Sequence, residues 1–300
     1  HRPMASSPKH GGKATLTRCR CIVISKPPRS PYPRGMLVRI ALLTSLAVFG
    51  PANATTQEEA LTASLLPGWQ MDGGAYMAAV DLMLAPGWKT YWRSPGEAGI
   101  PPTFDWSGSD NVKSVRIHWP TPSVFKTNGM QTIGYHDRLL LPVEVTPEDP
   151  TRAVTLALKM DLGICDNICL PASVSIRAAL PSPGALDAGI TAALAARAAT
   201  ADEGGVTAVA CMIEPIRDGL RLTARVALPD PGTEEVDAIE TADPAVWVSE
   251  ATAERSADML VAVAELVPPE GAPFPLDRSG VTLTILANGG AVEVKGCPEP

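Results

Sequence analysis

Histidine, aromatic residues and long apolar runs are all scarce in this sequence. Its four histidines lie at positions 1, 10, 118 and 136, and aromatic residues make up 5% of the chain. No histidine or further cysteine is therefore close in the sequence to Cys165 and Cys169, although a zinc site needs four ligands, usually as two close pairs. The lack of a third cysteine shortly after Cys169 also argues against an iron–sulfur cluster. We predict no metal site and no cofactor.

One apolar stretch does occur, within residues 36–54, which read MLVRIALLTSLAVFGPANA. Arg39 gives it a basic start, residues 40–49 form an apolar core, and residues 52–54 form a cleavage site of the A-x-A type. This pattern predicts a secretory signal peptide in preference to a buried core helix. The stretch is too short for a membrane span, and no other segment approaches the roughly 18 apolar residues required. We expect an exported mature chain without a membrane span.

Residues 1–35, upstream of this signal, are basic, rich in proline and serine, and without apolar periodicity. We interpret them as a disordered segment or as upstream sequence joined by a wrongly assigned start, which the position of Met36 favours. Cys19 and Cys21 lie in this segment, and we give them no role.

Positive charge is scarce in the rest of the chain. Residues 1–54 hold nine of the 25 Lys and Arg and no Asp or Glu, which leaves 16 basic against 32 acidic groups, a net charge of −16. A chain this acidic is a poor partner for nucleic acid or for anionic lipid. We therefore expect no nucleic-acid partner.

Proline and glycine are abundant, with 30 and 25 residues, and favour a turn-rich β architecture over a helical bundle. Apolar residues alternate with others in segments 80–84, 115–119, 139–145, 154–160, 174–176, 220–228, 246–248, 259–263, 281–285 and 292–294. The turn at 288–290, Asn-Gly-Gly, predicts a hairpin between the last two. Short strands at this spacing are typical of a β-sandwich.

The alternation is interrupted at residues 181–205, where Leu186, Ile190 and Leu194 share one face of a short Ala-rich helix. We interpret this segment as a connector between domains. The predicted organisation is therefore all-β, with one sandwich in residues 55–182, a helical linker in 183–205 and a second sandwich in 206–300.

Four cysteines remain after residue 54, which allows three pairings. A bridge between Cys211 and Cys297 would close a loop of about 86 residues and contribute about 4.5 kcal/mol, so we interpret it as structural. A bridge between Cys165 and Cys169 would contribute only about 2 kcal/mol. Short-loop disulfides of this kind are typically strained, exposed and readily exchanged. We favour a reversible pair over an inert bridge, with the attacking thiolate supplied by a partner because Asp166 opposes thiolate formation.

Two longer segments, IGYHDRLLLPVEV (133–145) and LALKMDLGICDNICLPASVSI (156–176), resemble the N-terminal periplasmic domain of the thiol:disulfide interchange protein DsbD family. The shared pattern is a Y-x-D-x-L-x-LPV strand, a short spacer, then two cysteines and a proline. Residues 85–112, APGWKTYWRSPGEAGIPPTFDWSGSDNV, look closer to the ScsB, or copper-tolerance, branch. The resemblance covers about residues 65–180, and ScsB-like proteins also carry a second β domain similar to residues 206–300.

This resemblance implies an immunoglobulin-like fold for the sandwich and a location in the periplasm. It implies a module that accepts electrons from a membrane-embedded thiol carrier of the DsbD type and passes them to oxidised periplasmic proteins with a thioredoxin fold. The DsbD type has two more residues between its cysteines, so loop strain and potential are expected to differ. The membrane and thioredoxin-like domains of the full-length family do not follow, so the chain is a fragment or a stand-alone module.

The family also implies roles for single residues. Cys169 matches the cysteine that forms mixed disulfides, and Cys165 its resolving partner. Phe125 matches the aromatic residue of a cap loop that shields the pair, and Tyr91 matches a tyrosine near the active site; ordinary packing is the alternative for both. The tryptophans at 88, 92, 106 and 119 are expected in the sandwich core.

A binding module, copper-related or protein-binding and with two structural disulfides, is the competing functional class. Nine methionines invite a copper site, but no M-x-x-M or H-x-H cluster occurs. Redox titration distinguishes the two classes, because only an exchange module has a readily reducible 165–169 pair.

Overall fold

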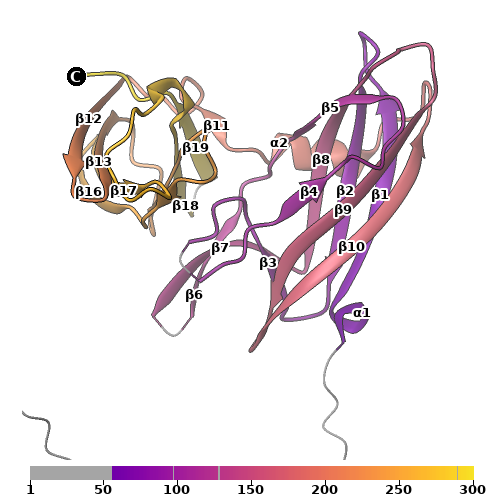
Figure 1. Ribbon diagram of the computed structural model, residues 1–300, viewed down its shortest axis with the longest axis horizontal. Coiled ribbons are helices and arrows are strands. Elements are labelled where there is room, and N and C mark those ends of the chain that lie inside the picture. Colours follow the sequence, from indigo (N-terminus) through magenta and orange to yellow (C-terminus); the bar gives the residue numbers. More distant parts are fainter. Residues whose placement is uncertain (1–55, 97, 128, 289) are drawn as a thin grey trace, which may run out of the picture. The chain divides into compact units, whose positions relative to one another are not determined.

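The structure is a computed structural model that describes residues 56–300 except 97, 128 and 289. In this part of the chain β-strands form four sheets, which confirms the predicted all-β class (Figure 1). The predicted signal peptide and the segment before it lie outside the described residues. Among the residues described, no helix has the length and apolar character needed to cross a membrane.

The first sandwich consists of two antiparallel sheets within residues 61–180. One sheet has the strand order β1 (Leu61–Gln70), β2 (Tyr76–Leu84), β8 (Arg138–Pro147), β5 (Val112–Ile117). The other, which we call the cysteine sheet, has the order β10 (Cys169–Leu180), β9 (Val154–Cys165), β3 (Lys89–Tyr91), β7 (Met130–His136), β6 (Ser123–Thr127). Strand β4 (Thr103–Asp105) also pairs with β9, and a short helix α1 (Gln57–Ala60) precedes β1.

The core of this sandwich lies between the two sheets, because each strand turns alternate side chains toward it. On β9 the core-facing residues include Leu158, Met160 and Ile164, and on β8 they include Leu141 and Val143. The four tryptophans expected in the core all pack there; those at 88 and 92 are buried, and those at 106 and 119 are partly buried.

The second sandwich lies within residues 199–295. One sheet has the order β11 (Ala199–Thr200), β19 (Gly290–Lys295), β18 (Thr282–Ala287), β14 (Val236–Glu240). The other has the order β12 (Ala208–Ile216), β13 (Gly219–Ala227), β17 (Met259–Val267), β15 (Trp247–Val248), and β16 (Thr252–Ser256) also pairs with β17. A single 3₁₀ turn, η1 (Arg278–Gly280), precedes β18. The hairpin predicted around residues 288–290 is confirmed by β18 and β19.

The predicted helix is α2 (Ala188–Ala195). Its N-cap is Asp187, whose carboxylate accepts a hydrogen bond of 2.9 Å from the backbone N–H of Ile190. Ile190 is buried against Met77 and Ala79 of β2, so this helix packs on the first sandwich. Strand β11 lies in the range predicted as linker and pairs in parallel with β19. The domain boundaries themselves stay a prediction.

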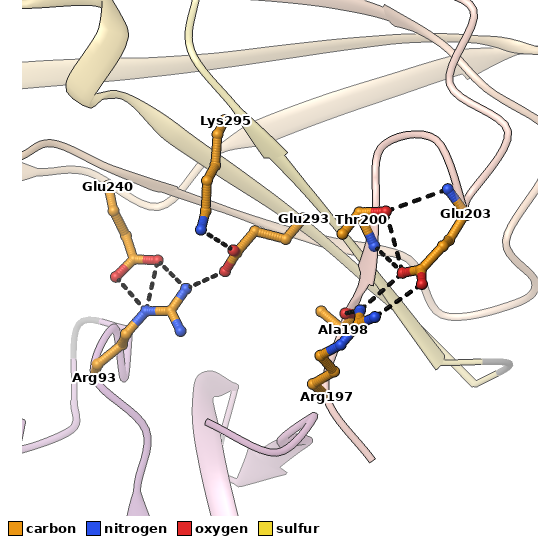
Figure 2. A network of polar contacts seen from close by, with 8 residues as sticks. All are labelled: Arg93, Arg197, Ala198, Thr200, Glu203, Glu240, Glu293 and Lys295. Atoms are coloured by element: carbon orange, nitrogen blue, oxygen red, sulfur yellow. Dashed lines mark hydrogen bonds and ion pairs between the residues drawn. The ribbon is translucent and has the colours of Figure 1, made fainter. Parts of the chain in front are cut away.

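Arg93 connects the end of β3 to the second sandwich. Its Nε and Nη2 donate to the carboxylate of Glu240 at 3.0 to 3.1 Å, and Nη2 also donates to Glu293 at 2.7 Å (Figure 2). The guanidinium lies over the ring of Trp92, 4.3 Å from its centroid. Charged hydrogen bonds of this two-pronged form are directional, so they hold the chain just after Tyr91 in place.

Candidate redox site

Cys165 and Cys169 form a disulfide at the tip of the β9–β10 hairpin. Cys165 is the last residue of β9 and Cys169 the first of β10, and the two pair directly across the ladder. The three residues between them form an exposed turn, which joins the strands expected from the alternation at 154–160 and 174–176. Within the turn, Asn167 donates from its side-chain amide to the carboxylate of Asp166 at 2.9 Å.

Cys165 lies on the face of β9 that points away from the sandwich core. Leu162 and Ile164 face the core, so Gly163 and Cys165 belong to the opposite face. Earlier residues of that face, Asp161 among them, are exposed, whereas Cys165 is only 1% exposed. Something other than the core must therefore cover its sulfur.

Tyr91 provides this cover. Its hydroxyl donates to the Sγ of Cys165 at 2.8 Å and lies 3.4 Å from the Sγ of Cys169. The side chain is 2% exposed, and burial raises the pKa of the phenol above its ordinary value. The hydroxyl therefore stays protonated at neutral pH and remains available as a hydrogen-bond donor to sulfur.

The two cysteines differ in exposure. Cys165 is buried beneath Tyr91, whereas Cys169 is exposed, as is its neighbour Ile168 with 61% of its surface accessible. In thiol–disulfide exchange the thiolate attacks along the S–S bond, and the sulfur that is reached depends on access. Cys169 is therefore the more accessible end of this disulfide for an incoming thiolate.

A row of side chains crosses the cysteine sheet at this level. Lys89 of β3 pairs with Cys165 on one side and with His136 of β7 on the other. The half-buried ring of Phe125 on β6 joins them, with the Nζ of Lys89 5.2 Å from its centroid and the His136 ring edge-on at 6.1 Å. The structure thus brings Phe125 next to the immediate neighbours of the disulfide, on the β6–β7 hairpin.

Three residues near the disulfide were not singled out from the sequence. Lys89 and His136 carry no motif, and only strand register places them beside Cys165. Gly163 did carry a signal, because an isolated glycine in a strand pattern marks the close approach of another group. The hydroxyl of Thr90 donates to the carbonyl oxygen of Gly163 at 2.9 Å, and this hydrogen bond ties β3 to β9.

The second disulfide, between Cys211 and Cys297, lies in a different environment. Both residues belong to the core of the second sandwich, with 1% and 3% of their surfaces exposed. Arg278 donates from one Nη1 to both of their carbonyl oxygens, at 3.1 and 3.0 Å. A thiolate from solvent has no direct route to this bond.

A metal centre was also considered for the cysteines. Within residues 56–300, apart from the three that are not described, no group of three or more His, Cys, Asp or Glu is placed to hold a metal ion.

Comparison with known proteins identifies the first sandwich. Residues 62–181 match the family model of the thiol:disulfide interchange protein DsbD, N-terminal. The crystal structure of the N-terminal periplasmic domain of ScsB from Proteus mirabilis superposes with a TM-score of 0.59 at 22% identity, covering 82% of this chain and 97% of that one. No curated protein matches the sequence. Residues 62–181 are therefore a DsbD N-terminal-like domain, in a chain whose fold is ScsB-like.

Proposed function

We propose that this protein is a periplasmic thiol–disulfide interchange module. It accepts electrons from a membrane-embedded thiol carrier of the DsbD type and reduces oxidised periplasmic proteins of the thioredoxin fold. The observation that carries the proposal is the asymmetry of the Cys165–Cys169 disulfide, in which Cys169 is an exposed residue and Cys165 is buried under a hydrogen-bond donor. The match of residues 62–181 to the DsbD N-terminal family supports it.

The proposed reaction proceeds in two exchanges. A thiolate of the carrier attacks Cys169, forms a mixed disulfide and releases Cys165 as a thiolate. The second carrier thiol then attacks the carrier sulfur of the mixed disulfide, which releases Cys169 as a thiolate and leaves the carrier oxidised. In the reverse role, reduced Cys169 attacks the substrate disulfide and Cys165 resolves the mixed disulfide. Electrons thus pass through one pair of sulfurs without a cofactor.

Phe125 is proposed as a cap over this site. Its contacts with Lys89 and His136 are weak, because an exposed cation–π contact contributes about 0.5 to 1 kcal/mol. A docking partner can displace contacts of this size. The periplasmic location rests on the predicted signal peptide in residues 36–54 and on the match to periplasmic domains. A link to copper tolerance, implied by the ScsB resemblance, stays a prediction.

Trapping tests the proposal. In Cys165→Ser the resolving thiol is gone, so Cys169 should accumulate a stable mixed disulfide with a thioredoxin-fold partner offered in its oxidised form. Cys169→Ser is the matched control and should trap far less, because its remaining thiol is buried. Non-reducing electrophoresis and mass spectrometry of the cross-linked peptide provide the measurement. Cross-linking through Cys165 would contradict the assigned roles, and no cross-link in either variant would contradict the exchange function.

A further inference from the structure

We propose that Gly163 is a positioning residue for the exchange chemistry, because only a residue without a side chain lets the Tyr91 hydroxyl reach the sulfur of Cys165. The inference rests on the proposed function for its significance. Its physical content, the acidity of the Cys165 thiol, can be measured independently.

The space at Gly163 is fully taken by other groups. A Cβ placed there would lie 2.8 Å from the Cβ of Ile100 and 3.1 Å from both Cδ2 and Cε2 of Tyr91. The first distance is shorter than carbon atoms tolerate, and the second is tight, so even alanine would push the aromatic ring or Ile100 outward. One edge of the Tyr91 ring, its Cδ2 and Cε2 atoms, therefore occupies the space that a side chain at 163 would need.

Backbone conformation gives no other reason for glycine at this position. Gly163 pairs with Pro171 in an unbroken antiparallel ladder, and it is not among the glycines with a left-handed φ. Its one side-chain partner, the hydroxyl of Thr90, bonds the carbonyl oxygen, which every residue has. The requirement for glycine is therefore one of space for Tyr91 and Ile100.

The position of the ring matters because of the charge that develops during exchange. When an incoming thiolate bonds to the Sγ of Cys169, the bond to Cys165 breaks and its electron pair stays on the Sγ of Cys165. That thiolate forms in a buried place, where an uncompensated charge is costly. The Tyr91 hydroxyl, already 2.8 Å away, donates to the developing charge without rearrangement. A lower pKa of the leaving thiol makes its departure faster.

Ile100 holds the opposite side of the same space. It lies in the loop before β4 and is 42% exposed, although its Cβ borders the space above Gly163. Gly163 thus accommodates the side chain of Tyr91 from β3 and that of Ile100 from the loop that follows, and a side chain at 163 would displace at least one of them. Displacement of either loosens the cover over Cys165.

The test is a double-mutant cycle on the full chain. Each variant carries Cys169→Ser, so that Cys165 is the only free thiol of the pair, and its ionisation is followed by thiolate ultraviolet absorption against pH. We expect Gly163→Ala and Tyr91→Phe each to make the Cys165 thiol about tenfold less acidic, the effect of one hydrogen bond to a charged group. In the variant that combines Gly163→Ala with Tyr91→Phe, the Cys165 thiol should be no less acidic than in Tyr91→Phe alone, because Gly163 affects the thiol only through the Tyr91 hydroxyl.

Gly108→Ala is the matched control, because a Cβ there meets only ordinary contact with Ala157 at 3.5 Å, and it should leave the acidity unchanged. If Gly163→Ala does not fold, the double variant Gly163→Ala, Ile100→Gly replaces it. This variant lacks the Cβ of Ile100, which is the atom closest to the new methyl group, and keeps the contact with the Tyr91 ring. It is compared with Ile100→Gly alone. Unchanged acidity of Cys165 in the folded variant, or an equal further loss in the Tyr91→Phe background, would overturn the inference. Failure of the exchange function would appear separately, as an absence of trapping by Cys165→Ser.

Discussion

The two sandwiches of this protein each contain one disulfide, and the two bonds sit in opposite environments. Cys211 and Cys297 are both buried in a core and join segments 86 residues apart. Cys165 and Cys169 are four residues apart on the outer face of a sheet, and Cys169 is exposed. A long loop gives a bridge its stabilising effect, and exposure gives a bridge its reactivity. Stabilising effect and reactivity therefore depend on where a disulfide lies in the fold, and the S–S bond alone determines neither.

The largest expected effect concerns stability. Replacement of Cys211 and Cys297 by alanine should lower the free energy of unfolding by about 4.5 kcal/mol, because the bridge closes a long loop. The same replacement of Cys165 and Cys169 should cost about 2 kcal/mol. Denaturant unfolding of both double variants measures the difference. Equal losses would remove the distinction between a structural and a reactive bridge.

Reduction rates should differ in the opposite sense. A mild dithiol should open Cys165–Cys169 about 100-fold faster than Cys211–Cys297, because Cys169 is an exposed residue and the other bond lies in a core. Timed alkylation followed by mass spectrometry gives both rates in one sample, and the denatured chain serves as the control in which the rates converge. Equal resistance of both bridges in the folded chain would contradict the redox interpretation.

The second sandwich should also account for a pH dependence of stability. Asp237 of β14 is buried, and neither of its carboxylate oxygens has a hydrogen-bond partner among the described residues. Burial, together with the nearby charge of Glu235, raises the pKa of this carboxyl to about 7. The positive charge of Arg255 partly opposes the shift. The folded carboxyl holds its proton when the unfolded one has lost it, so stability falls as pH rises from about 4 to 7. From pH 5 to 8 this loss should be about 2 kcal/mol.

Asp237→Asn should flatten this pH dependence and stabilise the protein above pH 7, as measured by thermal or denaturant unfolding across pH. Asp258→Asn, at an exposed position, is the control and should leave the profile unchanged. A wild-type profile that is already flat between pH 5 and 8 would show that Asp237 is solvated or paired.

The smallest expected effect concerns the cap. Phe125→Ala should speed reduction of Cys165–Cys169 by a small thiol a few-fold with little change in Tm, because the ring makes only weak contacts with Lys89 and His136. Val124→Ala is the matched control. Val124 is next to Phe125 in the chain, but its side chain packs against the core, so this variant should lower Tm without faster reduction. Unchanged kinetics in a folded Phe125→Ala variant would exclude a gating role.

Sequence reasoning was most successful where a pattern repeats along the chain. Alternation along residues 154–160 and 220–228 predicted strands, and they form β9 and β13. The expected helix forms at Ala188–Ala195 and turns Ile190 and Leu194 toward the first sandwich, but Leu186 lies before its first residue and is 77% exposed, so its assignment to the apolar face was wrong. Local periodicity decides such elements, because each residue's preferred face depends on its near neighbours. The resemblance of residues 133–145 and 156–176 to a known family is confirmed by the match over 62–181.

The sequence by itself determined the all-β class, the hairpin that carries Cys165 and Cys169, and the long separation of Cys211 from Cys297. Only the tertiary structure decided which sulfur is covered and by what. Alternation along β9 places Cys165 on the outer face, where exposure would be expected, yet Tyr91 from β3 buries it. Tyr91 and Cys165 are 74 residues apart in the sequence, and their strands are brought side by side by the pairing of Lys89 with Cys165 and of Thr90 with Ile164. Such contacts depend on register between distant strands, which no local pattern encodes.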